Sequence, residues 1–507
     1  MTRRHLVSML VGMELCFGGR SWAGGLNFPT NGTMSLARGG ANVAKVADPT
    51  AIVNNPAGLA GLSGFRLVFD NDLTHQHLCF QRGGTYPGTP GPGTYAGQPF
   101  PRVCRMNKGM FYIPMLSASY GWRDWTFALG GYGPHAVGRR NFSRQVTVHD
   151  SMGLPVRAPG PTRYDVLSQD VLVIFFTAAA AWRAADWLDI GFAIQPTFTE
   201  MRFGMNVPLN PSNLDPDSDV YFAIHNKGFA LTGLLGAKIR PWKHLEIGLS
   251  VRLPVSSKTK GTATIHLPPS LIDLGGPVLH FHKGSQVTMS SSLPLYLRFG
   301  VRYRWLTGPK SDSVEIADLE ADVQWERWSS MRALDTVVHA DMIGDDLGVF
   351  RLPHFYQDTI SLRLGSTFTI PRSIGGGRLS FSAGLFYDSA ASPLEYTRLD
   401  YQAFSLLGFG LGAAFTIRGI QIQLAVSHAV GGVGWPWEFH LKRRVDRSCI
   451  QPVDPFNPPD LVRCDPYGNG YDASKDIGRG TYESSYTTVS LGFQIMFDEL
   501  LRRTPTR

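Results

Sequence analysis

The feature that most constrains this chain is an alternation of apolar and polar side chains, with a period of two residues, that recurs along almost its whole length. In the segment 420–427, Ile, Ile, Leu and Val alternate with Gln, Gln, Ala and Ser, and the segments 245–253 and 489–497 have the same pattern. Successive side chains of a β-strand point to opposite faces, so each segment predicts a strand with one apolar face. The sequence therefore predicts an all-β protein.

Fourteen segments carry this pattern, and many of them are longer than the five or six residues usual in soluble sheets. Their lengths match or exceed the nine to eleven residues that a tilted strand needs to cross a bilayer. The predicted strands are 65–80, 109–121, 125–139, 168–183, 187–204, 225–240, 245–266, 284–305, 314–328, 354–370, 376–388, 402–417, 420–432 and 482–497.

Short and long connections alternate between these segments. The longer ones run from about a dozen residues to nearly fifty, and the tight turns are predicted at 122–124, 184–186, 241–244, 371–375 and 418–419. Outer-membrane barrels are built in this order, with an even number of strands, short periplasmic turns and long outer loops. A sheet immersed in lipid must also close, because its edges would otherwise stay unpaired. We therefore expect a transmembrane antiparallel β-barrel of about 14 strands, spanning 65–497, in the cell outer membrane of a Gram-negative bacterium.

The two ends of the chain lie outside this predicted barrel. Residues 1–23 have the features of a signal peptide, with Arg3 and Arg4 before an apolar stretch and Ser21-Trp22-Ala23 as a cleavage site. The irregular, small-residue segment 24–64 is long enough to fold back into the lumen, so we expect it to form an N-terminal hatch, or plug. Residues 498–507 are expected to be a periplasmic C-terminal tail.

The composition argues against several other classes of protein. The longest apolar run, 171–182, has 12 residues, which is too short for a membrane helix. The formal charge is +8, but Lys and Arg are scattered and 442–444 is the one basic run, so we expect no nucleic acid partner. No Ser/His/Asp set has the context of a known catalytic motif, and we expect no enzymatic activity and no cofactor.

Four cysteines remain after signal cleavage, as two sequence-local pairs in segments rich in Gly and Pro. This pattern favours two loop-closing disulfides, one between Cys79 and Cys104 and one between Cys449 and Cys464, in an oxidising compartment. Zinc binding and free thiols are the competing interpretations, although no Cys-x-x-Cys spacing is present. His75 and His77 share a strand face with Cys79, but we expect no metal there.

The eighth and ninth predicted strands carry opposite charges on the face away from their apolar side chains. A hairpin between them would place Arg302 near Asp318 and Arg298 near Asp322, all facing the lumen. The plain interpretation is a charge ladder that stabilises the lumen wall. The alternative is that one of the two arginines is unpaired and binds the anionic head of a ligand.

The segment 32–59, GTMSLARGGANVAKVADPTAIVNNPAGL, resembles the N-terminal hatch of the FadL/TodX outer-membrane transporters of long-chain fatty acids and aromatic hydrocarbons. The pattern of that family is a Gly/Ala-rich lead with Arg, an Ala-Asp pair and then Asn-Pro-Ala. The segments 116–134, 245–265 and 321–330 are similar to its second hairpin, its middle strand and its Trp-x-x-Trp-Ser strand. The resemblance implies a 14-stranded barrel with a hatch in the lumen.

The hatch motif is Asn55, Pro56, Ala57 and Gly58. Pro56 fixes its own φ and favours an extended Asn55, and Ala57 and Gly58 permit close approach to the wall. The resemblance implies that the motif sits against an inward kink of the third strand, whereas an ordinary loop turn is the alternative.

The third predicted strand contains Gly130, Gly131, Gly133 and Pro134, which weaken ladder pairing. In the resembled family such a kink opens a lateral gap, or gate, through which an apolar ligand leaves the lumen. A glycine-rich strand end without a gap is the alternative.

Ligand binding is assigned to apolar segments at both ends of the predicted path. Leu271, Ile272 and Leu274 lie in an unusually apolar outer loop and are the candidate capture site, although they could simply pack within the loops. The resemblance implies that Leu26 and Phe28 line the inner pocket.

These features predict a passive outer-membrane transporter, a monomer, for fatty acids or other hydrophobic compounds such as hydrocarbons. Outer loops would capture the ligand and the kinked third strand would release it laterally, beside outer-membrane lipid and lipopolysaccharide. The alternative is a polar-solute porin or a surface adhesin built on the same barrel.

Overall fold

The structure, a computed structural model, describes residues 31–106, 109–134, 138–208, 214–268, 279–281, 284, 286–308, 313–342, 345–346, 348–370, 375–401, 403–432, 442–452, 463–467 and 476–501. None of the helices in these ranges has the length and hydropathy needed to span a bilayer.

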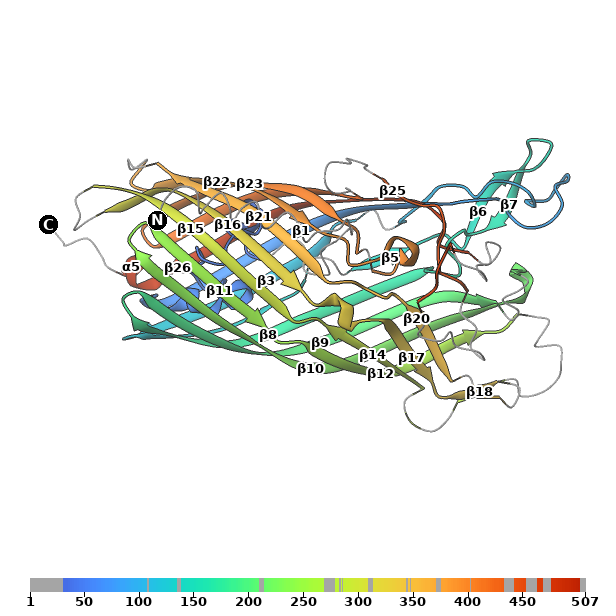
Figure 1. Cartoon of the computed structure of the whole chain (residues 1–507), viewed down its shortest axis with the longest axis horizontal. Coiled ribbons are helices and arrows are strands. Elements are labelled where there is room, and N and C mark those ends of the chain that lie inside the picture. Colours follow the sequence, from blue (N-terminus) through green and yellow to red (C-terminus); the bar gives the residue numbers. More distant parts are fainter. Residues whose placement is uncertain are drawn as a thin grey trace.

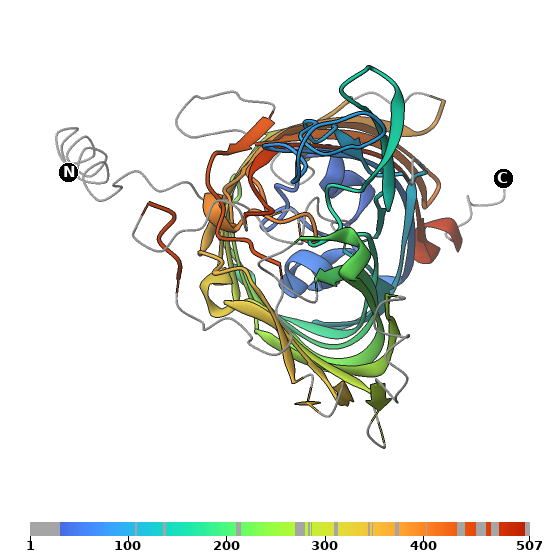
Figure 2. The ribbon, with the colours of Figure 1, turned by 90° about the vertical axis from the view of Figure 1, so that its right-hand side faces the viewer.

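The chain forms a closed antiparallel barrel of 14 strands, and the end-on view in Figure 2 shows the ring. The first and last strands, β1 and β26, pair from Arg66↔Met496 to Arg82↔Gly480 and so join the two edges of the sheet. In order around the wall the strands are β1 (Gly64–Arg82), β3 (Phe111–Trp122), β4 (Trp125–Tyr132) continued by β5 (Arg139–Asn141), β8 (Ser168–Ala185), β9 (Leu188–Pro208), β10 (Asp219–Trp242), β11 (Leu245–Arg252) continued by β12 (Val255–His266), β14 (Val287–Leu293) continued by β15 (Tyr296–Thr307), β16 (Val314–Glu326) continued by β17 (Ala333–Val338), β20 (Val349–Pro353) continued by β21 (Thr359–Thr369), β22 (Arg378–Asp388), β23 (Leu406–Ile417), β24 (Ile420–Gly431) and β26 (Gly480–Met496).

Every predicted strand is present, but three of them are interrupted. The predicted strands 125–139, 245–266 and 284–305 each divide into two, and the breaks contain Pro134, Pro254 and Pro294. Proline has no N–H to donate to the ladder, so a proline in a wall strand ends the pairing locally. The break at Pro134 is the one that matters for the candidate site.

The barrel has its apolar side chains outside and its polar side chains inside. On β1, Phe69 and Leu73 are exposed on the outer face, whereas Asp70, Asp72 and Thr74 on the inner face are fully buried. The other wall strands also carry exposed large apolar residues, among them Leu129, Ile194, Phe229 and Leu385. This distribution suits a wall that faces lipid on one side and a filled polar lumen on the other.

The smaller elements lie at the two ends of the barrel (Figure 1). The end with the short turns holds α2 (Thr33–Ala37), α3 (Ala51–Asn54) and η1 (Pro56–Leu59) inside, and α5 (Phe497–Leu501) follows the last strand there. The end with the long loops carries β2 (Val103–Cys104), β6 (Gln145–His149), β7 (Pro155–Pro159), β13 (Leu279–Phe281), β18 (Ala340–Met342), β19 (Asp345–Asp346), β25 (Lys442–Val445), η2 (Pro216–Ser218) and η4 (Leu394–Tyr396). The short helix η3 (Trp328–Ser330) lies in the wall, at the break between β16 and β17.

Candidate functional site

Residues 31–64 fill the lumen at the short-turn end, as the blue ribbon in Figures 1 and 2 shows. We call these residues the hatch. Its backbone approaches the wall at inward-facing glycines. A Cβ atom on Gly384 would lie 2.0 Å from the carbonyl carbon of Arg38, and one on Gly410 would lie 2.1 Å from the carbonyl oxygen of Leu36. A wall of larger residues would therefore exclude the hatch in this position.

The Asn-Pro-Ala motif ties the hatch to β9 and β10. The Asn55 side chain accepts from the N–H of Ala57 at 3.1 Å, and its Nδ2 donates to the carbonyl of Val43 at 2.8 Å and to that of Ala237 on β10 at 3.1 Å. A glycine in the wall makes room for the Asn55 side chain, because a Cβ atom on Gly236 would lie only 2.0 Å from Asn55 Oδ1.

The expected neighbour of the motif, the kink of the third strand, is therefore corrected. The motif lies on β9 and β10, and the hatch side chain that meets Gly130 of the third strand is Ile52. Gly58, expected to approach the wall, instead passes close to the carbonyl oxygen of Val46 within the hatch.

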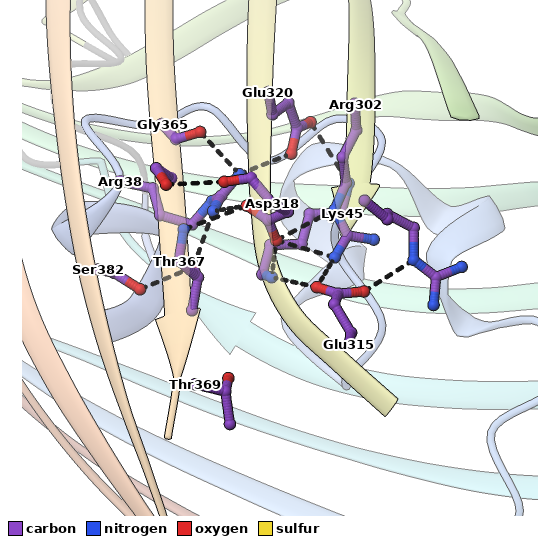
Figure 3. A network of polar contacts seen from close by, with 12 residues as sticks. Arg38, Lys45, Arg302, Glu315, Asp318, Glu320, Gly365, Thr367, Thr369 and Ser382 are labelled. Carbon is purple, nitrogen blue, oxygen red and sulfur yellow. Dashed lines mark hydrogen bonds and ion pairs between the residues drawn. The ribbon is translucent and has the colours of Figure 1, made fainter. Parts of the chain in front are cut away.

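Charged side chains hold the hatch on a different part of the wall, at β15, β16 and β21 (Figure 3). Arg38 donates to Asp318 at 2.5 Å and to Glu320 at 3.0 Å, and all three side chains are fully buried. The same guanidinium donates to the hydroxyl of Thr367 at 2.8 Å. Buried charges are stable only when they are paired and hydrogen-bonded, so Arg38 depends on these partners and they depend on it.

A second hatch cation, Lys45, contacts Asp318 and also Glu315. Desolvation, with Arg302 and Arg38 close by, lowers the pKa of Lys45 to about 8. The positive charge of Lys45 is therefore present below about pH 8 and is lost as the pH rises above that value.

The hatch supplies two of the five cations in this cluster. The backbone N–H groups of Asn42 and Val43 also donate to Asp322 there, at 2.8 and 3.1 Å. The wall supplies three cations and five carboxylates, and the hatch supplies the two remaining cations; the members are Lys238, Arg302 and Arg304, then Glu246, Glu315, Asp318, Glu320 and Asp322, then Arg38 and Lys45.

The predicted charge pairs of this hairpin are found in part. Arg302 pairs with Asp318 at 2.8 Å, as predicted, and also with Glu246 and Glu315. The predicted pairing of Arg298 with Asp322 is wrong, because the strand register places Arg298 opposite Gln324. The Nε of Arg298 donates to the side chain of Gln324 at 2.7 Å.

Arg298 also donates to hatch oxygen atoms, the carbonyl of Val53 and the side chain of Asn54, both at 3.2 Å. Both predicted arginines thus have protein partners. This geometry favours the charge ladder over the binding of an anionic ligand head.

An opening in the wall lies where the third strand breaks. β4 pairs with β8 as far as Tyr132↔Phe175, and β5 resumes the pairing at Arg139↔Asp170, where the N–H of Val171 also donates to the carbonyl of Gly138 at 3.4 Å. Among the described residues, no ladder pairs 172–174 of β8 with the third strand. Across the gap, the pairing of β3 with β4 ends at Met115↔Tyr132. The opening therefore has the start of β3 on one side and the middle of β8 on the other.

Of the predicted kink residues, Gly131, Gly133 and Pro134 line the lower edge of this opening, whereas Gly130 and Gly131 keep their ladder pairing with β3 and β8. Gly133 and Pro134 follow the last paired residue of β4, and Asn31 of the hatch donates from Nδ2 to the carbonyl of Gly133 at 2.8 Å. A Cβ on Gly133 would lie 3.0 Å from the carbonyl oxygen of Val173. The hatch and β8 therefore both contact the edge that the kink creates.

A cavity of about 830 Å³ occupies the opening and crosses the wall. Its lining includes the inward-facing Ile113 and Tyr132 together with the outward-facing Tyr112 and Leu172. Volumes of this size are typical of pockets for small organic ligands. At the rim, Arg139 pairs with Asp170 at 2.9 Å and Arg202 with Glu200 at 3.2 Å.

Two clusters of buried apolar side chains meet beside the opening. One buried cluster includes Phe80, Met201 and Phe222 in the outer half of the barrel. A second cluster, between the hatch and the wall, includes Ile52 and Phe175. Val173 packs against both clusters and lines the cavity, so the apolar packing of the lumen reaches the opening.

The remaining predicted site residues have different outcomes. Leu26, Phe28, Leu271, Ile272 and Leu274 lie outside the described residues. The structure contains two disulfides, one joining Cys79 to Cys104 and one joining Cys449 to Cys464. His77 and Glu483 lie near Cys79 with metal-binding atoms within 4.8 Å of one another, but the Cys79 sulfur is bonded in the disulfide.

Sequence reasoning missed a buried ion cluster in the outer lumen. His354 contacts Asp400 at 2.8 Å and Arg398 contacts Asp165 at 2.8 Å, with every one of these residues nearly or fully buried. Burial acts to raise the pKa of Asp400, but His354 and Arg398 hold it below its usual range. Arg398 and Asp400 lie in one loop, Asp165 lies in another, and His354 lies at the break between β20 and β21, so no spacing in the sequence could have grouped all four.

Comparisons with known proteins agree with this architecture. A family model described as outer membrane protein transport protein (OMPP1/FadL/TodX) matches residues 142–428. Among curated proteins, no sequence matches the chain.

Solved structures share the fold at low sequence identity. A Pseudomonas aeruginosa FadL homologue has a TM-score of 0.67 at 16% identity, with 94% of this chain and 100% of that chain covered. The Ralstonia pickettii toluene transporter TbuX has a TM-score of 0.57 at 17% identity, covering 92% and 99%. The P. putida toluene transporter TodX has a TM-score of 0.57 at 14% identity, covering 92% and 98%.

Proposed function

This chain belongs to the outer membrane protein transport family (OMPP1/FadL/TodX), and we propose that it is a passive transporter of long-chain fatty acids or other hydrophobic compounds. The protein lies in the outer membrane of a Gram-negative bacterium. Its family is a family of transporters and not of enzymes. The solved relatives include toluene transporters, which supports a hydrophobic cargo.

The observation that carries the proposal is the cavity that crosses the wall at the break of the third strand. Its lining runs from the inward-facing Ile113 and Tyr132 to Tyr112 and Leu172 on the lipid-facing surface of the barrel. A molecule that follows this lining and leaves sideways never has to cross the hatch. The gain on leaving water is about 0.8 kcal/mol per methylene group, so a long alkyl chain would stay on apolar surface throughout.

We assign the remaining steps to segments named from the sequence. The outer loop with Leu271, Ile272 and Leu274 is proposed to capture the ligand, and Leu26 and Phe28 are proposed to line the inner pocket. The hatch closes the direct path to the periplasm, so the kink with Gly130, Gly131, Gly133 and Pro134 provides the lateral exit.

Filling the cavity tests this function. Val173→Trp adds a large side chain at the opening, and Ile194→Trp adds the same side chain to the lipid-facing wall, where Ile194 is 55% exposed. We expect uptake of labelled oleate or toluene to fall with Val173→Trp and to stay near the wild-type rate with Ile194→Trp. Equal uptake by the wild type, both variants and cells without the protein would contradict the transport function.

The alternative of a polar-solute porin is tested by conductance in planar bilayers. The hatch residues that contact the wall are buried, so we expect the wild-type protein to pass little current. A stable open-pore conductance would favour the porin. Binding of whole cells to a surface, lost on deletion of the protein while uptake is unchanged, would favour the adhesin.

Lipopolysaccharide is the proposed partner of the outer wall. Lys227 of β10 lies directly opposite Lys260 of β12 and contacts Glu200 at 3.6 Å, and Lys258 is on the same outward face of β12 as Lys260. Like charges opposite each other in a ladder repel, and phosphate groups of the outer leaflet would neutralise them. We expect the double substitution Lys258→Glu and Lys260→Glu to lower the amount of lipopolysaccharide that copurifies with the protein. We also propose that the protein is a monomer.

A further inference from the structure

The upper edge of the opening is formed by a short segment that replaces β3 in the wall. β3 pairs with β1 only as far as Phe111↔Thr74. Beyond that point β1 pairs with β2, through Cys79↔Cys104 and Phe80↔Val103. We call residues 103–106 the lintel, since they lie between β1 and β5 above the cavity.

The lintel is hydrogen-bonded to the strands on both of its sides. The N–H of Arg105 donates to the carbonyl of Leu78 on β1 at 2.8 Å, and the N–H of Met106 donates to the carbonyl of Asn141 on β5 at 2.8 Å. β5 in turn pairs with β8. The wall is therefore continuous above the opening, and the lintel is the only strand-like link between β1 and β5 among the described residues.

The Arg105 side chain fastens the same edge a second time. Its guanidinium donates to the carbonyl of Gln76 at 2.7 Å, to that of Arg139 at 3.3 Å and to that of Gly109 at 3.4 Å. It also stacks over the ring of Phe111, 4.9 Å from the ring centroid, and it lines the cavity while only 5% exposed. One side chain thus joins β1, the start of β3 and β5 around the opening.

The disulfide makes this attachment covalent. Cys104 is the residue before Arg105, and its bond to Cys79 fixes the lintel to β1. Hydrogen bonds to a short, two-residue strand can open locally at low cost, whereas a covalent link cannot. The second disulfide, between Cys449 and Cys464, contacts a separate cluster with Tyr396 and Ile450 and does not line the cavity.

We propose that the lintel, held by the Cys79–Cys104 disulfide and by Arg105, fixes the height of the opening and so sets the largest molecule that can leave through the wall. The statement that the lintel limits the size of the cargo rests on the proposed transport function. The statement that the lintel fixes the size of the opening does not depend on that function. Arg105 is a positioning residue in this proposal, because it acts through the backbone of the edge that it holds.

A labelling experiment measures the size of the opening without transport. A single cysteine is placed at Val173, which lines the cavity, in the full-length protein in outer membranes. Its rate of reaction is measured with N-ethylmaleimide and with a bulky maleimide, in the parent, in Arg105→Gln, and in Cys79→Ser with Cys104→Ser. The control is Cys449→Ser with Cys464→Ser, which removes a disulfide that does not line the cavity.

We expect the bulky reagent to react severalfold faster in both lintel variants, while N-ethylmaleimide reacts at the parent rate and the control behaves as the parent does. A general loss of folding would speed both reagents and is thereby distinguished. An unchanged ratio of the two rates in both lintel variants would overturn the proposal.

Uptake gives the second readout. In cells, we expect the lintel variants to raise the uptake of pyrene relative to toluene, since a wider opening favours the larger molecule. If the wild type transports neither compound, the proposed transport function is contradicted, and the ratio of the two labelling rates still tests whether the lintel fixes the size of the opening. If the wild type transports both and neither ratio changes in the variants, the lintel proposal fails and the transport function stands.

Discussion

Two of the contacts between the hatch and the barrel wall differ in their chemistry. At β15, β16 and β21 it is held by buried ion pairs, with Arg38 and Lys45 completing a charge cluster of the wall (Figure 3). At β4 and β8, next to the opening, it is held by apolar packing through Ile52 and Val53. Ion pairs in a buried site demand fixed geometry, whereas apolar contacts tolerate small displacements. From this difference we infer that the ion pairs anchor the hatch on the side of the barrel away from the opening. The part of the hatch that lies beside the opening is freer to move.

Removing the anchor should have the largest effect. Arg38→Met removes the cation that pairs with the buried Glu320 and one of the three cations that contact Asp318, and breaking a buried pair in this way costs about 3 to 5 kcal/mol. We expect the hatch to leave its seat, with a new conductance in planar bilayers and new protease sites in 31–64. Arg327→Met, at an exposed position, is the control. A hatch that stays seated in Arg38→Met would show that the charged contact is not the anchor.

Weakening the apolar contact should have a smaller and more local effect. Ile52 is fully buried, and Ile52→Ala should cost about 2 to 3 kcal/mol through lost packing and the space it leaves. We expect faster amide hydrogen exchange in 51–54 without a conductance change. Leu129→Ala, on the lipid face of β4 where Leu129 is 66% exposed, is the matched control. A conductance as large as that of Arg38→Met would remove the distinction between the two contacts.

The Asn-Pro-Ala motif should rank next. Asn55→Ala removes the side-chain cap of η1 and leaves the carbonyls of Val43 and Ala237 without their donor, at a cost of about 1 to 2 kcal/mol. We expect a modest rise in proteolysis of the hatch and unchanged strand content. Asn55→Asp keeps the side-chain oxygen that accepts from the N–H of Ala57, but it removes the N–H₂ group that donates to Val43 and Ala237. Equal effects of Asn55→Ala and Asn55→Asp would mean that the donor bonds to Val43 and Ala237 carry the stabilisation.

The smallest effect is expected at the buried ion cluster of the outer lumen, which can be compared with the ion cluster that holds the hatch. The pKa of Asp400 is held below its usual range, so its contribution to stability is present above roughly pH 4 and is lost as the pH falls below that value. Burial raises the pKa of Asp165, so this residue takes up a proton at higher pH and does not add to the loss.

We therefore expect the loop 389–401 to resist protease from pH 7 to about pH 4 and to be cut below that pH. Asp400→Asn should remove this acid step, whereas Asp446→Asn, at a site that is 68% exposed, should retain it. An acid step of the same size in Asp400→Asn would assign the effect to another group.

The sequence was sufficient to predict the barrel because period-two alternation and turn length are local properties. The strands at 420–432 and 482–497 were found within one or two residues of their ends. The kink at Gly133 and Pro134 was also predicted, since proline removes a ladder donor whatever surrounds it. Errors began with register, which depends on the whole hairpin, and so Arg298 was paired with the wrong residue.

The candidate site was predictable only where it coincides with such local signals. The inward glycines that admit the hatch, such as Gly236 and Gly384, occur in strands with no local reason for them, and their purpose is visible only with the hatch in place. Arg105 carries no motif, because its partners on β1, β3 and β5 are brought together by the barrel.

By itself, the sequence determined which residues form strands, which face of each strand meets lipid, and where the third strand must break, because these depend on neighbours along the chain. The tertiary structure alone decided where the hatch is anchored, which charges neutralise one another, and what frames the opening in the wall. Those depend on contacts between segments hundreds of residues apart, as between Arg38 and Asp318, and no local pattern encodes such distances.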